Sequence, residues 1–208
     1  MERKDNYAIQ VQQAKQHFLT YNQQAILQKH TIAYDNAYLY PYMLGKRYRL
    51  SRATGDLQRQ EGALWQDANT HAEVMTLLDW LCDSRADRHL AGRWNNMQNF
   101  GLLFHRNLLE DRKDPTAALF DRHPDALHRA CRDLGGTPLP GCDIGYAIEL
   151  FDGLCIALQF WAGDEEFAPR LRWLWDENAL QYLRYETMYF AVGLLTRRLT
   201  DRFSLYLP

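Results

Sequence analysis

Carboxylates are concentrated in the last third of the chain, where two kinds of chemistry are open to them. Asp164 and Glu166 flank a third acidic residue, Asp176 and Glu177 follow about one strand later, and Glu186 comes ten residues after Asp176. Paired carboxylates bind hard divalent cations, or divide into a general acid and a general base when their surroundings separate their pKa values. We therefore ask which of these side chains the fold brings together.

Glu186 has the most informative position. It shares an apolar helical stripe with Leu183 and Phe190, so we expect it to be buried and to need partners. A helix rises about 1.5 Å per residue, which carries Glu186 towards the acidic loop of Asp164 and Glu166 if the helix runs antiparallel to the preceding strand. Two interpretations stay open. Glu186 shares a site with Asp164 or Glu166, or it only accepts hydrogen bonds from a Tyr, Trp or Arg and fixes the helix.

Asp176 has a different predicted role. A strand of six residues spans roughly 20 Å, which places Asp176 at the far end of the strand from the acidic loop. It directly precedes the predicted last helix, so we expect it to be the N-cap of that helix, with Glu177 in the first turn.

Large aromatic residues accompany the carboxylates. Trp161 ends a predicted strand, and Tyr182 lies on the last helix. Such residues form either the core or the wall of a pocket for a flat ligand. The predicted binding site therefore consists of Asp164, Glu166, Glu186, Trp161 and Tyr182.

The periodicity of apolar residues predicts an α+β fold in which an antiparallel sheet, made of a hairpin and a C-terminal meander, packs with an N-terminal helix, middle helices and a buried C-terminal helix. Asp152-Gly153 is a strong signal for a two-residue hairpin turn. Pro124 restarts a helix, and Gly135-Gly136 ends it. We expect one domain over residues 1–208, with helices at 7–28, 64–83, 115–134 and 177–200, a hairpin within 37–61, strands near Trp94 and 102–104, and a meander of 145–151, 154–161 and 170–175.

Charge and cysteine usage exclude several classes of protein. The net charge is −2 with no basic stripe, which argues against nucleic acid as a partner. No apolar run is long enough to cross a bilayer, and no signal peptide is apparent. We expect a soluble, cytoplasmic protein with its four cysteines reduced. His128 and Cys131 share a helix face but are only two ligands, so we assign no metal, and no motif indicates a cofactor.

Several segments carry a family resemblance. They are Tyr42–Leu50, Gly92–Trp94, Leu134–Gly136, Gly141–Asp143, Trp161–Ala168, Leu174–Ala179 and Tyr182–Glu186. In this order they resemble the prokaryotic domain-of-unknown-function 3786 family over about residues 20 to 200. The resemblance implies that Asp164, Glu166, Asp176 and Glu186 match emphasised acidic positions, although Trp175 stands where the family suggests Phe. It also implies an origin in anaerobic bacteria or archaea, where some relatives are joined to iron–sulfur domains that this chain lacks.

No activity follows from that resemblance. The leading hypothesis is an accessory domain that binds a small molecule or a partner protein in an aromatic pocket beside the acidic loop. The alternative is a carboxylate-dependent, metal-assisted hydrolase with Glu186 and residues 164–166 in its site. The residues leave open whether the protein is an enzyme.

Overall fold

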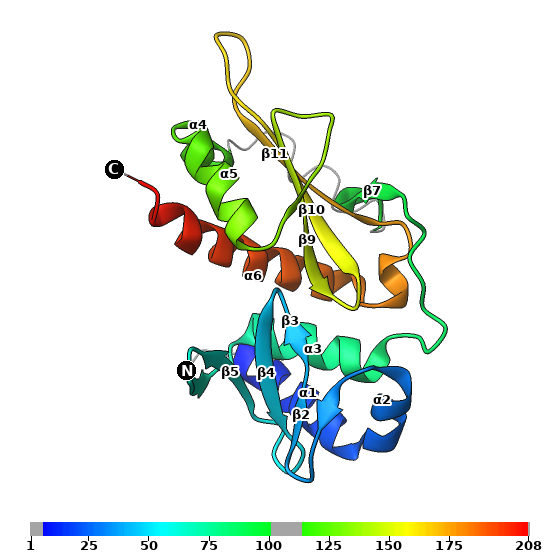
Figure 1. Ribbon diagram of the computed structural model, residues 1–208. Helices are drawn as coiled ribbons and strands as arrows, with labels where there is room; N and C mark the ends of the chain where they lie inside the picture. The colour runs from blue at the N-terminus through cyan, green and yellow to red at the C-terminus, as the bar shows by residue number, and fades with distance from the viewer. Residues whose placement is uncertain (1–5, 101–113, 208) are drawn as a thin grey trace, which may run out of the picture. The chain divides into compact units, whose positions relative to one another are not determined.

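The fold is α+β, as predicted. The computed structural model describes residues 6–100 and 114–207. These residues form six α-helices and two antiparallel sheets (Figure 1). The contacts divide the chain into two compact units: unit 1 is Met1–His89 with Gln181–Leu194, and unit 2 is Leu90–Leu180 with Leu195–Pro208. A single domain over 1–208 stays a prediction. No helix within the described ranges has both the length and the apolar character needed to cross a membrane.

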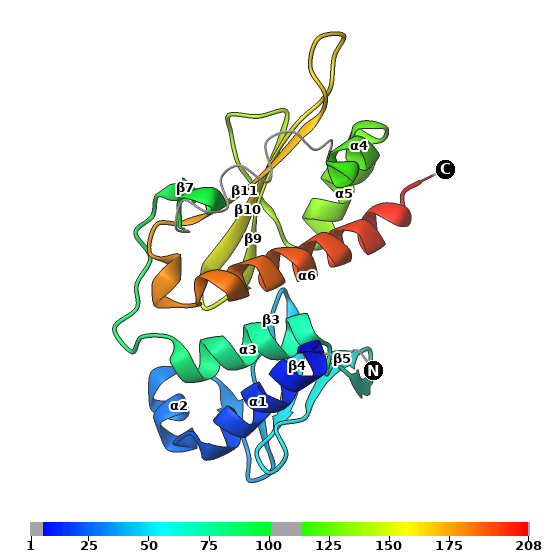
Figure 2. The same cartoon turned by 180° about the vertical axis from the view of Figure 1, so that it is seen from behind.

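Unit 1 is an antiparallel sheet with helices on one face. Its elements are α1 (Asn6–Thr20), α2 (Gln23–Lys29), β1 (Ala33–Tyr34), β2 (Tyr38–Tyr40), β3 (Tyr42–Met43), β4 (Lys46–Ser51), β5 (Leu57–Glu61), β6 (Leu64–Asp67), α3 (His71–Asp83) and the first half of α6 (Tyr185–Ser204). The strands pair in the order β1-β2-β4-β5-β6, and β3 pairs with β4. Helices α1 and α3 lie behind the sheet in Figure 1 and in front of it in Figure 2.

The hairpin predicted within 37–61 is confirmed as β4 and β5, with Leu50 opposite Leu57. Tyr48 and Leu50 are fully buried, while Arg47 and Arg49 between them are half-buried. This alternation gives the sheet an inner face towards the helices and an outer face towards solvent.

Two predicted helices have different limits in the structure. The helix expected over 7–28 is broken, because the Asn22 side chain accepts hydrogen bonds from the backbone N–H groups of Gln24 and Ala25 and so begins a new helix. The helix expected over 64–83 begins only at His71, since 64–67 pair with β5 as strand β6. Apolar residues at helical spacing do not exclude a short edge strand.

A buried carboxylate joins the sheet of unit 1 to α3. Glu73 is 2% exposed. It accepts hydrogen bonds from the Tyr48 hydroxyl at 2.9 Å and the Thr70 hydroxyl at 2.9 Å, and it forms an ion pair with Arg59. Thr70 also caps α3, because its hydroxyl accepts the backbone N–H of Glu73. Removing the carboxylate would leave a half-buried guanidinium and two hydroxyls with fewer partners.

We therefore expect Glu73→Ala to lower the free energy of unfolding by about 3–5 kcal/mol, the range for breaking a buried ion pair. The matched control is Glu61→Ala, because Glu61 also binds Arg59 but its side chain is 30% exposed. That variant should lose less than about 1 kcal/mol, as exposed ion pairs do. Urea denaturation of both variants makes the comparison, and equal losses would contradict it.

Unit 2 is built on the predicted C-terminal meander. Its elements are β7 (Trp94–Asn96), η1 (Met97–Asn99), α4 (Pro115–Asp121), α5 (Pro124–Asp133), β8 (Thr137–Pro138), β9 (Ile144–Phe151), β10 (Leu154–Trp161), β11 (Arg170–Asp176) and the second half of α6. The strand order β7-β11-β10-β9-β8 places β10 in the centre, as predicted. Asp152 and Gly153 have φ of 53° and 76°, which confirms the tight turn. The predicted strand near Trp94 is present, while 102–104 lies outside the described residues.

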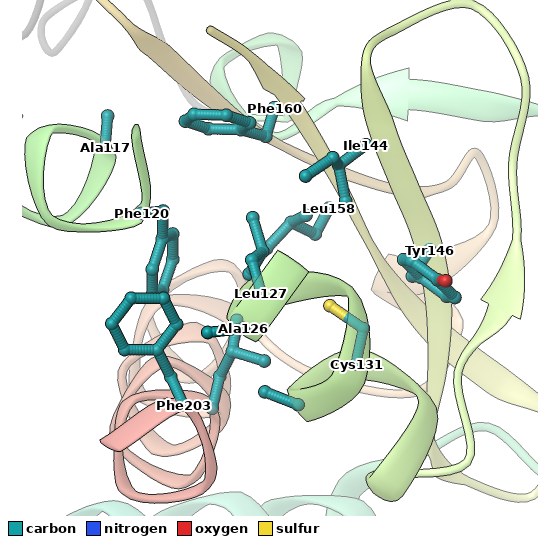
Figure 3. Packing of buried hydrophobic residues seen from close by; sticks show 12 residues of the cluster. Ala117, Phe120, Ala126, Leu127, Cys131, Ile144, Tyr146, Leu158, Phe160 and Phe203 are labelled. Atoms are coloured by element: carbon teal, nitrogen blue, oxygen red, sulfur yellow. The ribbon is translucent and has the colours of Figure 1, made fainter. Parts of the chain in front are cut away.

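The middle helices pack on this meander. Pro124 begins α5, and Gly135 follows its end with φ 74°, as predicted. Figure 3 shows Phe120 and Phe203 side by side, with Leu127 and Leu158 in the same cluster. Helix α6 starts at Tyr185 rather than 177, because 177–184 form turns and the short η3 (Ala179–Gln181).

Candidate functional site

A cleft of about 320 Å³ lies entirely within unit 1, among α1, α3 and the start of α6. We call it the acidic cleft, because two aspartates face one arginine in its wall. Its lining comprises Gln10, Gln13, Ala14, His17, Met75, Leu78, Asp79, Asp83, Arg184 and Thr187.

Helical spacing explains how three separate segments contribute to this wall. Met75, Asp79 and Asp83 recur every four residues along α3 and so lie on one face. Gln10 and His17 are two turns apart on α1. Since α1 packs against α3, these two faces meet. The residues at 184 and 187 then close the cleft from the first turn of α6.

Asp79 is the buried member of the cleft, with 6% exposure. Its Oδ2 accepts the backbone N–H of Arg184 at 2.9 Å, which places a negative charge at the N-terminus of α6. Its Oδ1 lies 3.4 Å from Arg184 Nε but has no hydrogen-bond partner among the described residues. Burial raises the pKa of Asp79, and hydrogen bonds from Thr187 and Arg184 only partly oppose that rise.

Asp83 is the more exposed acid of the pair. Its Oδ2 receives Arg184 Nη2 at 2.5 Å, and its Oδ1 lies 3.1 Å from His17 Nε2. The guanidinium therefore serves both aspartates and neutralises only one of them. The cleft is lined by two aspartates and one arginine, an excess of acidic groups that favours a cation over an anion.

Two of the predicted site residues, Asp164 and Glu166, lie in an exposed loop of unit 2. Asp164 Oδ1 accepts the backbone N–H groups of Phe167 at 2.7 Å and Glu166 at 2.8 Å. These bonds hold the pKa of Asp164 below its usual range. Trp161 precedes this loop and is half-buried, with the Arg172 guanidinium 5.2 Å from its ring centroid. Asp164 thus organises its own loop.

The other two predicted residues, Glu186 and Tyr182, belong to unit 1. Tyr182 is buried, with the Arg88 guanidinium 5.7 Å from its ring centroid. Glu186 is exposed in the first turn of α6, so the expectation that it is buried is wrong. Its neighbours Thr187 and Met188 occupy the buried positions instead, and Leu183, which suggested a shared apolar stripe, precedes α6. A site shared by Glu186 and the acidic loop of unit 2 stays a prediction.

Asp176 does not cap the last helix, which corrects the prediction. It ends β11, is 6% exposed, and accepts three backbone N–H groups, those of Ala91, Gly92 and Asn178, each at 2.8 Å. The side chain therefore fastens residues 91–92 to the end of the strand. Glu177 pairs with Arg93 in the same region rather than lying in a helix.

The helices and the two antiparallel sheets place the chain in the α+β class. More specifically, it belongs to the family described as Domain of unknown function (DUF3786), whose model matches residues 22–198. This confirms the resemblance seen in the sequence. Comparison with curated proteins and with solved structures finds no match. Within the described ranges, no group of three or more His, Cys, Asp or Glu residues could hold a metal ion.

Asp176 and Asp164 make a matched pair for a stability test, since both accept backbone N–H groups but only Asp176 is buried. Asp176→Asn replaces one carboxylate oxygen, which accepts backbone N–H groups, with an NH2 group that cannot accept them. This change should lower the free energy of unfolding by about 1–3 kcal/mol. Asp164→Asn should cost less than about 1 kcal/mol, because water replaces the lost bond. Chemical denaturation measures both, and a larger loss for Asp164→Asn would refute this assignment.

The raised pKa of Asp79 sets the sign of a pH effect. An unfolded Asp has a pKa of about 3.9. Above that value Asp79 stays protonated in the folded protein to a higher pH than in the unfolded chain. The contribution of Asp79 to the free energy of unfolding is therefore fully present below about pH 4 and is lost as pH rises through the pKa of the folded state. We expect the unfolding free energy of the wild type, minus that of Asp79→Asn, to fall over the pH range that begins near pH 4. Urea titrations across this range test it, and a rising difference would show a lowered pKa.

Proposed function

We propose that this protein is a small-ligand-binding domain whose ligand is a small organic cation held in the acidic cleft. The observation that carries this proposal is Asp79, a carboxylate lining the cleft with one oxygen that has no hydrogen-bond partner among the described residues. A buried polar atom without a partner costs free energy, so a ligand that supplies the missing donor gains that energy on binding.

The charge and the size of the cleft favour an amine. An ammonium group brings one positive charge and several N–H donors, which suits a wall where two aspartates share one guanidinium. The cleft volume of about 320 Å³ is at the small end of the range for ligand pockets. Ala14, Met75 and Leu78 supply an apolar surface for a short hydrocarbon chain.

The exposure of the Arg184 side chain supports a model in which an ammonium ligand replaces its guanidinium beside Asp79. Its side chain is 62% exposed although it pairs with both aspartates. It can therefore turn into solvent at little cost when an ammonium group takes its place beside Asp79. In the unliganded protein the same guanidinium limits the charge left in the cleft.

A hydrolase is the second candidate, favoured by the different environments of two acids in one cleft. Asp79 has a raised pKa, as a general acid requires, while Asp83 contacts His17 as an Asp–His base would. A hydrolase site with Glu186 and residues 164–166, the alternative drawn from the sequence, stays a prediction. Turnover of an amine-bearing ester or amide, lost in His17→Asn, would favour catalysis over simple binding.

Isothermal titration calorimetry with putrescine, ethanolamine and butylamine tests the proposal, with succinate as the anionic counterpart. We expect the amines to bind and succinate not to bind. Asp79→Asn should weaken amine binding by about ten- to a hundredfold, since a hydrogen bond to a charged group contributes about 1.5–3 kcal/mol.

The control is Glu186→Gln, which removes an exposed carboxylate from the first turn of α6 that does not line the cleft. Its amine affinity should equal that of the wild type. If Glu186→Gln loses binding while Asp79→Asn retains it, the site lies at Glu186 instead. Binding of succinate alone would show that the charge argument is wrong.

A further inference from the structure

The outer face of the sheet in unit 1 carries an ordered set of arginines and aromatic rings. Tyr38 and Tyr40 come from β2, Arg47 and Arg49 from β4, and Trp65 from β6, and all five are half-buried. We call this set the arginine–aromatic face. Helices α1 and α3 cover the opposite side of the sheet (Figures 1 and 2), so this side is not part of the core.

Each guanidinium lies between two rings. The Arg47 guanidinium is 4.7 Å from the ring centroid of Tyr40 and 5.9 Å from that of Trp65. The Arg49 guanidinium is 4.9 Å from Tyr38 and 4.8 Å from Trp65. A cation this close to an aromatic ring is attracted to the face of the ring, which restricts where the guanidinium lies.

The charge of these arginines is not neutralised by the protein. Among the described residues, neither Arg47 nor Arg49 has a carboxylate within ion-pair distance, and Arg49 donates only to the Gln58 side chain at 2.6 Å. By contrast, Arg59 on the inner face pairs with Glu61 and Glu73. The outer face therefore offers positive charge to an external anion.

A shallow groove extends the same face. Its volume is about 540 Å³, and Tyr38 belongs to both the groove and the arginine–aromatic face. Arg52 lies in this groove, where it donates to the Gln23 side chain and to the Asp35 backbone carbonyl and forms no ion pair within the described part of the chain. The groove thus adds a third cation beside an aromatic ring.

We propose that this face binds single-stranded nucleic acid. Unpaired bases stack on aromatic rings and on guanidinium planes, while arginines contact the phosphates. Arg47 and Arg49 are two residues apart on one strand, about 6.6 Å, a spacing that suits consecutive phosphates of an extended strand. An acidic peptide would satisfy the arginines but give the three rings no stacking partner.

This proposal opposes the expectation drawn from the overall charge of the chain. That expectation rests on the net charge of all residues. A binding surface such as the arginine–aromatic face needs only the residues at alternating positions of neighbouring strands. Arg47 and Arg49 are separated in sequence by Tyr48, which faces the other way. The proposal is independent of the acidic cleft and of any ligand bound there.

Fluorescence anisotropy with a labelled twelve-nucleotide oligothymidylate tests the face. We expect binding at low salt, with the logarithm of the affinity falling against that of the salt concentration by about 0.7 for each phosphate contacted. Arg47→Ala and Trp65→Ala should each weaken binding at least about fivefold, in keeping with stacking losses of about 1–3 kcal/mol. Circular dichroism confirms that each variant is folded.

Two further variants separate stacking from charge. Arg85→Ala removes an exposed arginine of unit 1 that pairs with Asp87, and it should leave the affinity unchanged. Arg47→Lys keeps the charge but loses the planar group, so it should bind more weakly than the wild type. No oligothymidylate binding at low salt, equal binding of a duplex, equal affinity in Arg47→Lys, or equally strong binding of polyglutamate would each overturn the proposal.

Discussion

A carboxylate that leaves water must receive hydrogen bonds from the protein, and this cost shapes both units of the chain. Three carboxylates are buried within the described residues, those of Glu73, Asp79 and Asp176. Glu73 takes two hydroxyl donors and an arginine, which fixes α3 against the sheet. Asp176 takes three backbone N–H groups, which fixes the segment before β7 to the end of β11. Each acid joins segments that the sequence keeps apart.

Asp79 follows the same constraint but meets it only in part. It accepts the N–H that begins α6, yet its Oδ1 has no hydrogen-bond partner among the described residues. A purely structural acid would gain from full satisfaction, as the other two buried carboxylates do. The incomplete set of donors, together with the cleft at this position, is the basis on which a ligand is proposed there.

The sequence predicts those parts of the fold in which local signals and tertiary contacts agree. The turn at Asp152-Gly153, the helix that begins at Pro124 and the central strand β10 all follow from residues close together in the chain. The prediction fails where a distant partner decides. The start of α6 depends on Asp79, about a hundred residues earlier, so local periodicity places that helix eight residues too soon.

The candidate site shows the same limit. A carboxylate on an apolar helical stripe was a sound signal, but it applies to Asp79, between Leu78 and Trp80, rather than to Glu186. The error arose because Leu183 precedes α6 and so does not extend a helical stripe through Glu186, while the buried residues of the helix lie on the face of Thr187, Met188 and Ala191. With the observed start, Thr187 and Met188 face inward and Glu186 faces solvent. Whether an acid on a helix is buried can thus be inferred from sequence only when the limits of the helix are known. Here the first turn of α6 is held by Asp79, which lies far away in the sequence.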